Sequence, residues 1–277
     1  MEQNSSTRLL PPYRALLAVD IVRFSRAQGI YLGDMRQLIP QVLERAMSLP
    51  GLQEIWDSRR FPASAGDDYV FGTDPKWLPL LISPLMGSLQ TVLEEVDHEL
   101  AARDRDLRLR LRAALHVGPV LDSGDPWRDR IGEPTVTTFR LLSSTVINDA
   151  LKHSHPSVTQ TAVIISQRVF DDVIRPGYAT LHPSEFTPVT AEVPGKDFVE
   201  PAWLYVPRPS RHASSENDTS ATVASDKEKV DRRSIGSTPI AVFHGPVGQS
   251  NNAHEMHVSQ TLPSEFFGRE SRGGQGE

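Results

Sequence analysis

The sequence FPASAGDDYVFG, residues 61–72, decides the fold. Small and turn-forming residues separate two apolar segments here, Leu52–Phe61 and Tyr69–Gly72. A Gly-Asp dipeptide between apolar runs of strand length is typical of a β-hairpin. The stretch therefore predicts two antiparallel strands joined by a turn that carries Asp67 and Asp68.

The elements around this hairpin follow from hydrophobic periodicity. Apolar residues recur at helical spacing over Met35–Met47 and, most clearly, over Leu85–Leu100. Leucine alternates with arginine over Leu107–Val117, which predicts a strand with one buried face and one basic, solvated face. A further helix is expected over Thr137–Leu151, and further strands are expected over Tyr13–Asp20, Val158–Ser166, Val189–Val193 and Ala202–Val206.

The order of these elements is β-α-β-β-α-β followed by an α-β extension. That order predicts an α+β domain of the ferredoxin-like, split βαβ plan. In this plan the first strand lies next to the hairpin. Asp20, which ends the first strand, and Asp67 in the hairpin turn are therefore expected to meet.

The composition excludes several classes of function. The chain has 277 residues and no cysteine, so disulfides, thiolate nucleophiles and Cys-ligated zinc are excluded. Its net charge of −6 argues against binding to nucleic acid or an anionic membrane surface. No apolar run has the length of a signal peptide or of a membrane span, and we expect a cytoplasmic protein.

Composition also predicts the domain organisation. Residues 1–12 are expected to be an N-terminal extension and residues 13–207 the folded domain. Residues 208–238 are rich in Ser, Thr and charge, as in a flexible linker. The β-prone segment 239–260 resembles bacterial amyloid signalling motifs, which would imply a partner protein, or it is an inert patch in the tail. Residues 261–277 are expected to be a disordered tail.

The paired acidic residues allow two interpretations. Divalent magnesium prefers hard oxygen ligands and usually binds one or two carboxylates together with substrate phosphates. Asp20 and Asp67 at adjacent strand ends suit that geometry, and Asp68 would replace Asp67 if the hairpin register slipped by one residue. Each aspartate taken alone is equally compatible with an ordinary turn or capping residue.

Five motifs in sequence resemble the catalytic domain of the class III nucleotidyl cyclases, the adenylate and guanylate cyclase family. They span the predicted domain in the family's order. They are LLAVDIVRFS (16–25), SAGDDYVFG (64–72), RLRAALHVGPV (110–120), DRIGEPTVTTFRLLSS (129–144) and EVPGKDFVEPAWLYV (192–206).

The resemblance implies a role for individual residues. Asp20 and Asp67 would bind two Mg²⁺ or Mn²⁺ ions, with Ile21 as a backbone-carbonyl ligand. Arg140 would stabilise the phosphoryl transition state. Asp129 and the residue at position 63 would read the base, and Lys196 would contact phosphate. In this family the metal aspartates and the base and transition-state groups come from different subunits, so the resemblance implies a homodimer that binds a nucleoside triphosphate.

Two positions depart from the purine-cyclase pattern. Ala63 stands where purine cyclases carry a Lys or Glu, and Val136 stands where the family has an Asn that orients the ribose. The first departure is similar to Pycsar-type antiphage cyclases, which make cyclic UMP or cyclic CMP. The second favours the alternative of a catalytically degenerate cyclase fold that acts as a signalling scaffold through its C-terminal motif. A diguanylate cyclase is disfavoured because the hairpin lacks a GG(D/E)EF motif.

Overall fold

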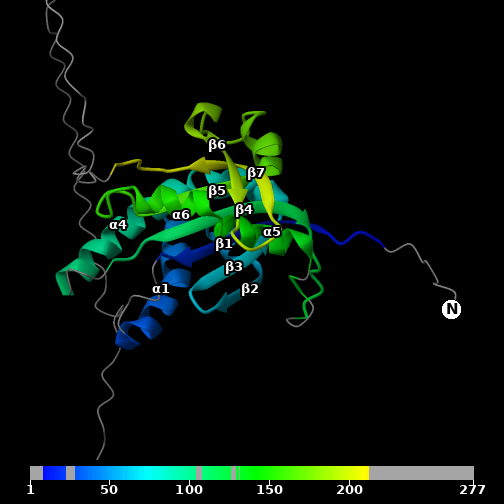
Figure 1. Ribbon diagram of the computed structural model, residues 1–277. Coiled ribbons are helices and arrows are strands. Elements are labelled where there is room, and N and C mark those ends of the chain that lie inside the picture. The colour runs from blue at the N-terminus through cyan, green and yellow to red at the C-terminus, as the bar shows by residue number, and fades with distance from the viewer. Residues whose placement is uncertain (1–8, 23–28, 104–107, 126–128, 131, 212–277) are drawn as a thin grey trace, which may run out of the picture. The chain divides into compact units, whose positions relative to one another are not determined.

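The computed structural model describes residues 9–22, 29–103, 108–125, 129–130 and 132–211. Within these ranges the chain forms one seven-stranded mixed sheet with helices, which confirms the predicted α+β class (Figure 1). The predicted amyloid-like segment 239–260, the tail 261–277 and nearly all of the linker lie outside the described residues. No helix in the described part of the chain is long and apolar enough to cross a membrane.

The first half of the domain contains β1 to β4. Its elements are β1 (Tyr13–Ile21), α1 (Gly29–Ser48), α2 (Gln53–Asp57), β2 (Arg60–Ala65), β3 (Asp68–Thr73), a 3-10 turn (Pro75–Trp77), α3 (Leu78–Ile82), α4 (Leu85–Arg103) and β4 (Leu111–Pro119). The second half adds α5 (Glu133–Leu142), α6 (Thr145–Lys152), β5 (Thr161–Ser166), α7 (Gln167–Val169), a π-helical turn (Phe170–Ile174), a second 3-10 turn (Pro183–Glu185), β6 (Thr187–Glu192) and β7 (Val199–Tyr205).

The strand order in the sheet is β2-β3-β1-β4-β5-β7-β6. Each of the first four strands is antiparallel to its neighbours among them, and their order is that of a ferredoxin-like βαββαβ unit. Strand β5 then joins β4 in parallel, and the β6–β7 hairpin closes the far edge. The β2–β3 hairpin and the β6–β7 hairpin lie at opposite edges of the sheet in Figure 1.

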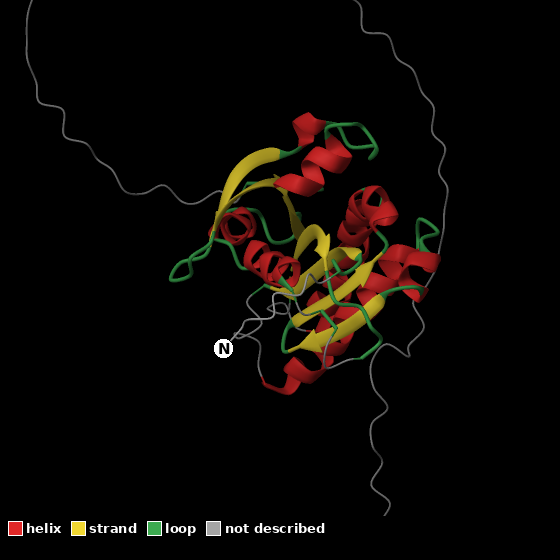
Figure 2. Ribbon diagram, turned by 90° about the vertical axis from the view of Figure 1, so that its right-hand side faces the viewer, coloured by secondary structure: helices red, strands yellow, loops and turns green. Residues whose placement is uncertain are grey.

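Helices cover both faces of the sheet (Figure 2). On one face α5 and α6 bury Leu141 and Ile147 against Ala18, Val70 and Ala114 of the central strands. The strand residues that alternate with these point to the other face and are also buried. Helices α1 and α4 pack against each other on that side, and the predicted helical stripes from Leu38 to Met47 and from Leu85 to Leu100 are buried.

Two predicted elements are wrong in type or number, and the strand predicted from Leu107 begins only at Leu111. Helix α2 occupies residues 53–57, where the first hairpin strand was expected, because Ile55 and Trp56 bury their side chains from a helical turn. The predicted helix over Thr137–Leu151 is two helices, α5 and α6. It breaks at Ser144, whose backbone is extended and whose hydroxyl donates a hydrogen bond to the carbonyl of Leu141 at 2.7 Å.

The predicted basic face of the Leu107–Val117 segment is also wrong. Arg110 is buried and donates hydrogen bonds to the Thr159 carbonyl at 2.9 Å and to the Ser154 hydroxyl. Arg112 forms an ion pair within the sheet. Helices cover both faces of the sheet (Figure 2), and Arg110, just before β4, and Arg112, within it, are both paired with groups of the protein.

The chain remains attached to the domain beyond β7. Arg208 forms an ion pair with Glu94 of α4 at 2.5 Å. The hydroxyl of Ser210 accepts a hydrogen bond from the backbone N–H of His155 at 2.9 Å. The packed region therefore includes the first residues of the segment that composition assigns to the linker.

Gly118 fixes the start of α5 against β4, and this contact can be tested. A Cβ atom at Gly118 would lie 2.5 Å from Cγ and 2.9 Å from Cβ of Pro134, whose ring is attached rigidly to the first turn of α5. We expect Gly118→Ala to lower the free energy of unfolding by about 1–3 kcal/mol through overpacking, measured by urea denaturation. Gly87→Ala in α4 is the control, because nothing lies within 4 Å of its added Cβ. Equal effects of the two substitutions would contradict the contact.

Candidate functional site

Three charged side chains form a row across the central strands. Asp20 at the end of β1 is the direct partner of Asp68 on β3 and of Arg112 on β4. Directly opposed residues in antiparallel strands place their side chains on the same face of the sheet. The row Asp68–Asp20–Arg112 therefore continues the face of Ala18 and Ala114, which α5 and α6 cover.

Asp20 and Arg112 form a buried, bidentate ion pair. The Nε of Arg112 donates to Oδ1 of Asp20 at 2.7 Å, and its Nη2 donates to Oδ2. The Asp20 side chain is only 6% exposed. The remaining nitrogen of Arg112, Nη1, donates to the side-chain oxygen of Asn148 on α6. Sequence patterning missed this pair, because a strand that alternates Leu with Arg is normally half exposed.

Asp67 lies beside this row, as expected from the hairpin. Its carbonyl accepts a hydrogen bond from the Ile21 N–H at 3.2 Å, so the hairpin turn is tied to the end of β1. Burial raises the pKa of Asp20 to about 7, although the Arg112 guanidinium opposes the shift; the carboxylates of Asp68 and Asp67 add to it. Burial and the charge of Asp67 also raise the pKa of Asp68 to about 6. The three carboxyl groups are therefore close enough to repel one another.

The donor chemistry of this group fits a magnesium or manganese ion whose coordination is completed by substrate. Among the described residues no group of three or more His, Cys, Asp and Glu side chains could hold a metal alone. One or two carboxylates plus phosphate and water is, however, the usual environment of Mg²⁺ in proteins. Asp20 and Asp67 would supply the carboxylates and Ile21 the carbonyl. A cation at Asp20 would compete with Arg112 for the same oxygens.

Arg140 contacts the β6–β7 turn, which also contains the predicted phosphate contact Lys196. Arg140 is on α5, and its Nη1 donates to the Asp197 carbonyl at 3.5 Å. Its guanidinium lies 5.5 Å from the ring centre of Phe198. Lys196 precedes these two residues in the β6–β7 turn and is exposed. Lys196 is therefore next in sequence to the residues that Arg140 contacts, and its role in binding phosphate stays a prediction.

Ala63 and Asp129, the two residues expected to read a base, line one cavity of about 370 Å³. The cavity lies between β2 and the loop that follows β4. Its other walls are mainly cationic or apolar, and they comprise Arg59, Arg60, Phe61, Pro62, Asp122, Gly124 and Arg130. Val136 on α5, at the position of the family's ribose-orienting Asn, is 42% exposed. Ala63 and Asp129, which the sequence analysis assigned to one site, therefore line the same cavity although they are 66 positions apart in the chain.

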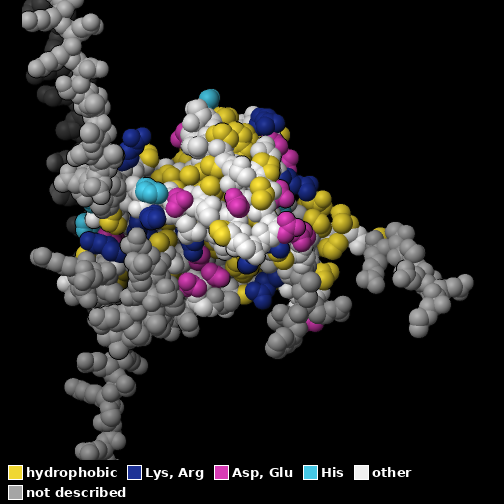
Figure 3. All heavy atoms as spheres, viewed as in Figure 1, with side chains coloured by type: hydrophobic (Ala, Val, Ile, Leu, Met, Phe, Trp, Pro, Cys, Tyr) yellow, Lys and Arg dark blue, Asp and Glu magenta, His cyan; other side chains and the backbone are white. Residues whose placement is uncertain are grey.

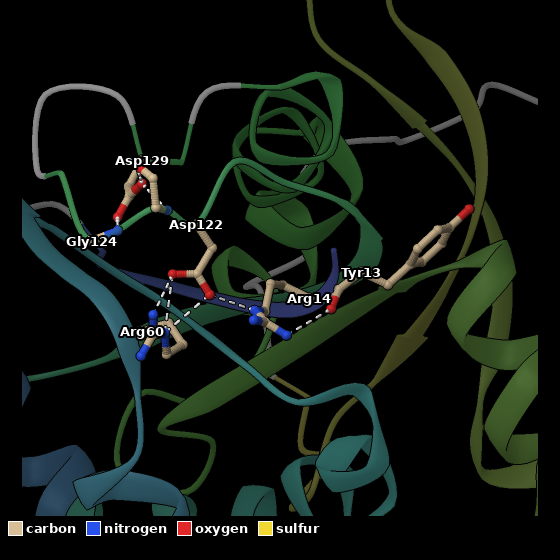
Figure 4. A network of polar contacts seen from close by, with 7 residues as sticks. Tyr13, Arg14, Arg60, Asp122, Gly124 and Asp129 are labelled. Atoms are coloured by element: carbon tan, nitrogen blue, oxygen red, sulfur yellow. Dashed lines mark hydrogen bonds and ion pairs between the residues drawn. The ribbon is translucent and has the colours of Figure 1, made fainter. Parts of the chain in front are cut away.

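The loop after β4 is held by two aspartates that sequence reasoning treated differently (Figure 4). Asp129 accepts hydrogen bonds from the Ser123 N–H and hydroxyl and from the Gly124 N–H, at 2.6–2.9 Å, and these bonds lower its pKa. Asp122, which drew no attention in the sequence, accepts from Arg14 at 2.7 Å and from Arg60 at 2.8–3.0 Å. Part of the acceptor capacity of Asp129 is therefore already used by its own loop.

No protein-family model matches the chain, and no curated protein matches it. Solved structures similar to it include adenylate cyclases of Trypanosoma brucei in their monomeric state (14% identity, 76% of this chain and 96% of that chain, TM-score 0.47). Another is the adenylyl cyclase CyaB from P. aeruginosa (14% identity, 70% of this chain and 93% of that chain, TM-score 0.46). A third is the catalytic core of a rhodopsin-guanylyl cyclase with converted specificity in complex with ATPalphaS (16% identity, 72% of this chain and 96% of that chain, TM-score 0.44). The TM-scores of these three are all below 0.5, and the likeness by itself assigns no function to this chain.

The Asp20–Arg112 pair should couple strongly in a double-mutant cycle. We expect Arg112→Gln to destabilise the domain by about 3 kcal/mol, because it leaves a buried carboxylate without its counter-charge. In the double variant Asp20→Asn/Arg112→Gln the loss should be smaller than the sum of the single losses by about 1–3 kcal/mol. Urea unfolding of the four proteins measures this coupling.

The control for this cycle is the Arg45–Glu95 ion pair between α1 and α4, whose side chains are 25% and 46% exposed. Arg45→Gln should cost less than about 1 kcal/mol, as is usual for exposed pairs. Additive losses at Asp20 and Arg112 would show that the pair does not form.

Proposed function

We propose that this chain is a metal-dependent nucleotidyl cyclase, which converts a nucleoside triphosphate to a 3′,5′-cyclic nucleotide and pyrophosphate. The observation that carries the proposal is the convergence of Asp20, Asp67 and Asp68 at one end of the central strands. A purely structural sheet gains nothing from three mutually repelling carboxyl groups at one site. The order of the sequence motifs and the shared cavity of Ala63 and Asp129 support the same function.

The reaction requires one bond to form and one to break at the α-phosphorus. The 3′-hydroxyl oxygen attacks in line, its proton is released, and the bond to the β-phosphate oxygen breaks. Divalent ions bound at Asp20 and Asp67 would lower the pKa of that hydroxyl and offset charge on the phosphate oxygens. Arg140 would donate hydrogen bonds to the oxygens that gain charge in the transition state, and Lys196 would hold the phosphates that leave.

The proposed enzyme acts as a homodimer. Arg140 is anchored by Asp197 and Phe198 in the β6–β7 turn, whereas Asp20 is anchored by Arg112, which in turn donates to Asn148. Two separately anchored half-sites suit an arrangement in which each active site takes one half from each subunit. Figure 3 shows hydrophobic side chains among the polar ones on one face of the molecule, and Leu9 and Leu10, at the start of the described chain, are 97% and 68% exposed. Exposed apolar side chains of this kind support an interface.

The proposed substrate is a pyrimidine nucleotide, UTP or CTP. Ala63 lines the cavity without a charge or a hydrogen-bonding group. The position that contacts the purine base in the resembled family therefore cannot form such a contact here. The resemblance to Pycsar-type cyclases supports an antiphage signalling role for the product.

A second candidate is a scaffold that binds nucleotide without turnover. The observation in its favour is that both Asp20 oxygens accept hydrogen bonds from Arg112, as they would in a structural ion pair. Val136 also favours this candidate, because its exposed apolar side chain cannot donate a hydrogen bond to a ribose. This candidate predicts nucleotide binding and dimerisation with no cyclic product.

Turnover separates the two candidates. Purified protein is incubated with each of the four NTPs and Mn²⁺, and cyclic products are measured by mass spectrometry. We expect cyclic UMP or cyclic CMP, and a loss of at least about 100-fold in Asp20→Ala, Asp67→Ala and Arg140→Ala. Arg175→Ala is the control, because Arg175 is 63% exposed and its side-chain contacts with Asp171 and the Phe170 ring are local to its own segment and far in sequence from the site. Absence of product from every NTP would reject the cyclase.

Complementation tests the shared active site. Asp20→Ala and Arg140→Ala are each inactive alone, but a mixed dimer regains one complete site from the two intact halves. Random exchange of subunits should therefore restore about a quarter of the wild-type rate. A mixture of Asp20→Ala with Asp67→Ala lacks the same half in both chains and should stay inactive. Equal recovery in both mixtures would exclude a site shared in this way.

A further inference from the structure

An irregularity in edge strand β2 determines which side chains face the cavity that Ala63 and Asp129 line, called the base cavity below. Arg60 pairs with Gly72 and Ala63 pairs with Val70, so β2 advances three residues while β3 advances two. The extra residue is a β-bulge. Since Gly72 and Val70 lie on the same face of β3, their partners Arg60 and Ala63 share that face as well. In a regular strand, residues 60 and 63 would point to opposite faces.

The bulge is built at some energetic cost. Phe61 has a φ of 39°, a left-handed backbone conformation that a bulky residue rarely adopts. Its ring lies where a side chain of Gly72 would be, since a Cβ added there would come within 2.2 Å of it. Strained backbone of this kind is concentrated at functional sites, where the surrounding structure enforces it. Here it places the guanidinium of Arg60 next to Ala63 in the cavity wall.

The described residues fix the guanidinium of Arg60 through two of its nitrogens and leave the third without a hydrogen bond. Its Nε and Nη2 donate to the carboxylate of Asp122 at 2.8–3.0 Å, and Figure 4 shows this carboxylate between Arg60 and Arg14. The Asp122 side chain is 1% exposed, whereas that of Arg60 is 49% exposed. The Nη1 amino group has no bond to Asp122, so it can donate to a ligand in the cavity.

The other arginine on β2's side of the cavity is committed elsewhere. Arg59 donates to the Tyr69 hydroxyl at 3.1 Å and to the Trp56 carbonyl at 2.5 Å, and its guanidinium stacks 3.9 Å from the Trp56 ring centre. The acceptor opposite Arg60 is Asp129. From the described residues its Oδ2 accepts one hydrogen bond, that of the Gly124 N–H, which leaves a further lone pair toward them. Beside Ala63 the cavity therefore offers a donor at Arg60, and its other wall offers an acceptor at Asp129 next to Arg130.

We propose that Arg60 reads the base in place of the residue absent at position 63, and that it selects uracil over cytosine. This inference rests on the proposed function, because it assigns the ligand of that cavity as a pyrimidine nucleotide. Uracil presents a carbonyl oxygen next to an N–H group, which matches a donor beside an acceptor. Cytosine presents an amino group next to an unprotonated ring nitrogen, which places donor against donor at Arg60. Mismatched polar groups of this kind are strongly disfavoured once water is excluded.

The test measures binding separately from turnover. Non-reactive α,β-methylene analogues of UTP and CTP are titrated into the full chain with Mn²⁺ by calorimetry. We expect the uridine analogue to bind about tenfold more tightly, as a charged hydrogen bond implies. Arg60→Gln carries both a donor and an acceptor and should reduce the preference to less than about twofold. Arg60→Lys keeps a donor-only cation and should retain the preference in part.

Arg14→Gln is the matched control, because Arg14 pairs with the same carboxylate of Asp122 but does not line the cavity. It should keep the wild-type preference. The inference is overturned if the two analogues bind equally or not at all, if the preference survives in Arg60→Gln, or if Arg14→Gln loses it equally. A uridine preference that depends on Arg60, without cyclic product from any NTP, would instead sustain the inference and reject only the catalytic part of the proposed function.

Discussion

The ion pair of Asp20 and Arg112 is the interaction on which this end of the sheet depends. A carboxylate at the end of a central strand, almost removed from water, is costly unless a cation is fixed beside it. Arg112 provides that cation from the adjacent strand, and Asn148 holds Arg112 from α6. The pair thereby connects β1, β4 and the helical layer. It also means that any divalent ion at Asp20 must be accompanied by a new partner for Arg112, and a triphosphate is a chemically suitable one.

Much of the fold could be predicted because its strongest signals are local. The stripes of α1 and α4 and the apolar run of β1 repeat at the periods of a helix and a strand, and the order of elements then leaves few topologies. The errors arose where a local signal was ambiguous. Leu52–Phe61 is apolar enough for a strand, yet Ile55 and Trp56 are buried from a helix. Ser144 ends a helix by bonding to Leu141, which a stripe of apolar residues does not reveal.

The site was only partly predictable, for a different reason. Asp20 with Asp67, and Ala63 with Asp129, could be grouped because topology alone brings their elements together. Arg112, Asn148 and Asp122 could not, because their importance comes from pairs that form between distant strands and loops. The alternation of Leu with Arg predicted a strand from Leu107, but β4 begins only at Leu111, and the predicted solvated environment is wrong for Arg110 and Arg112. A central strand can bury arginines when each finds a carboxylate or a carbonyl.

The bulge at Phe61 has a consequence for how proteins of this shape diversify. An edge strand tolerates insertions and deletions better than a central one, because only one side of it is bonded to a neighbour. Gaining or losing a single residue there exchanges the side chains that face inward without disturbing the strands behind them. Ligand preference can then change in one genetic step. A sequence alignment would find only Ala63 at the position expected to contact the base, four residues before Asp67. The bulge, however, brings Arg60 to the same face of β2 as Ala63.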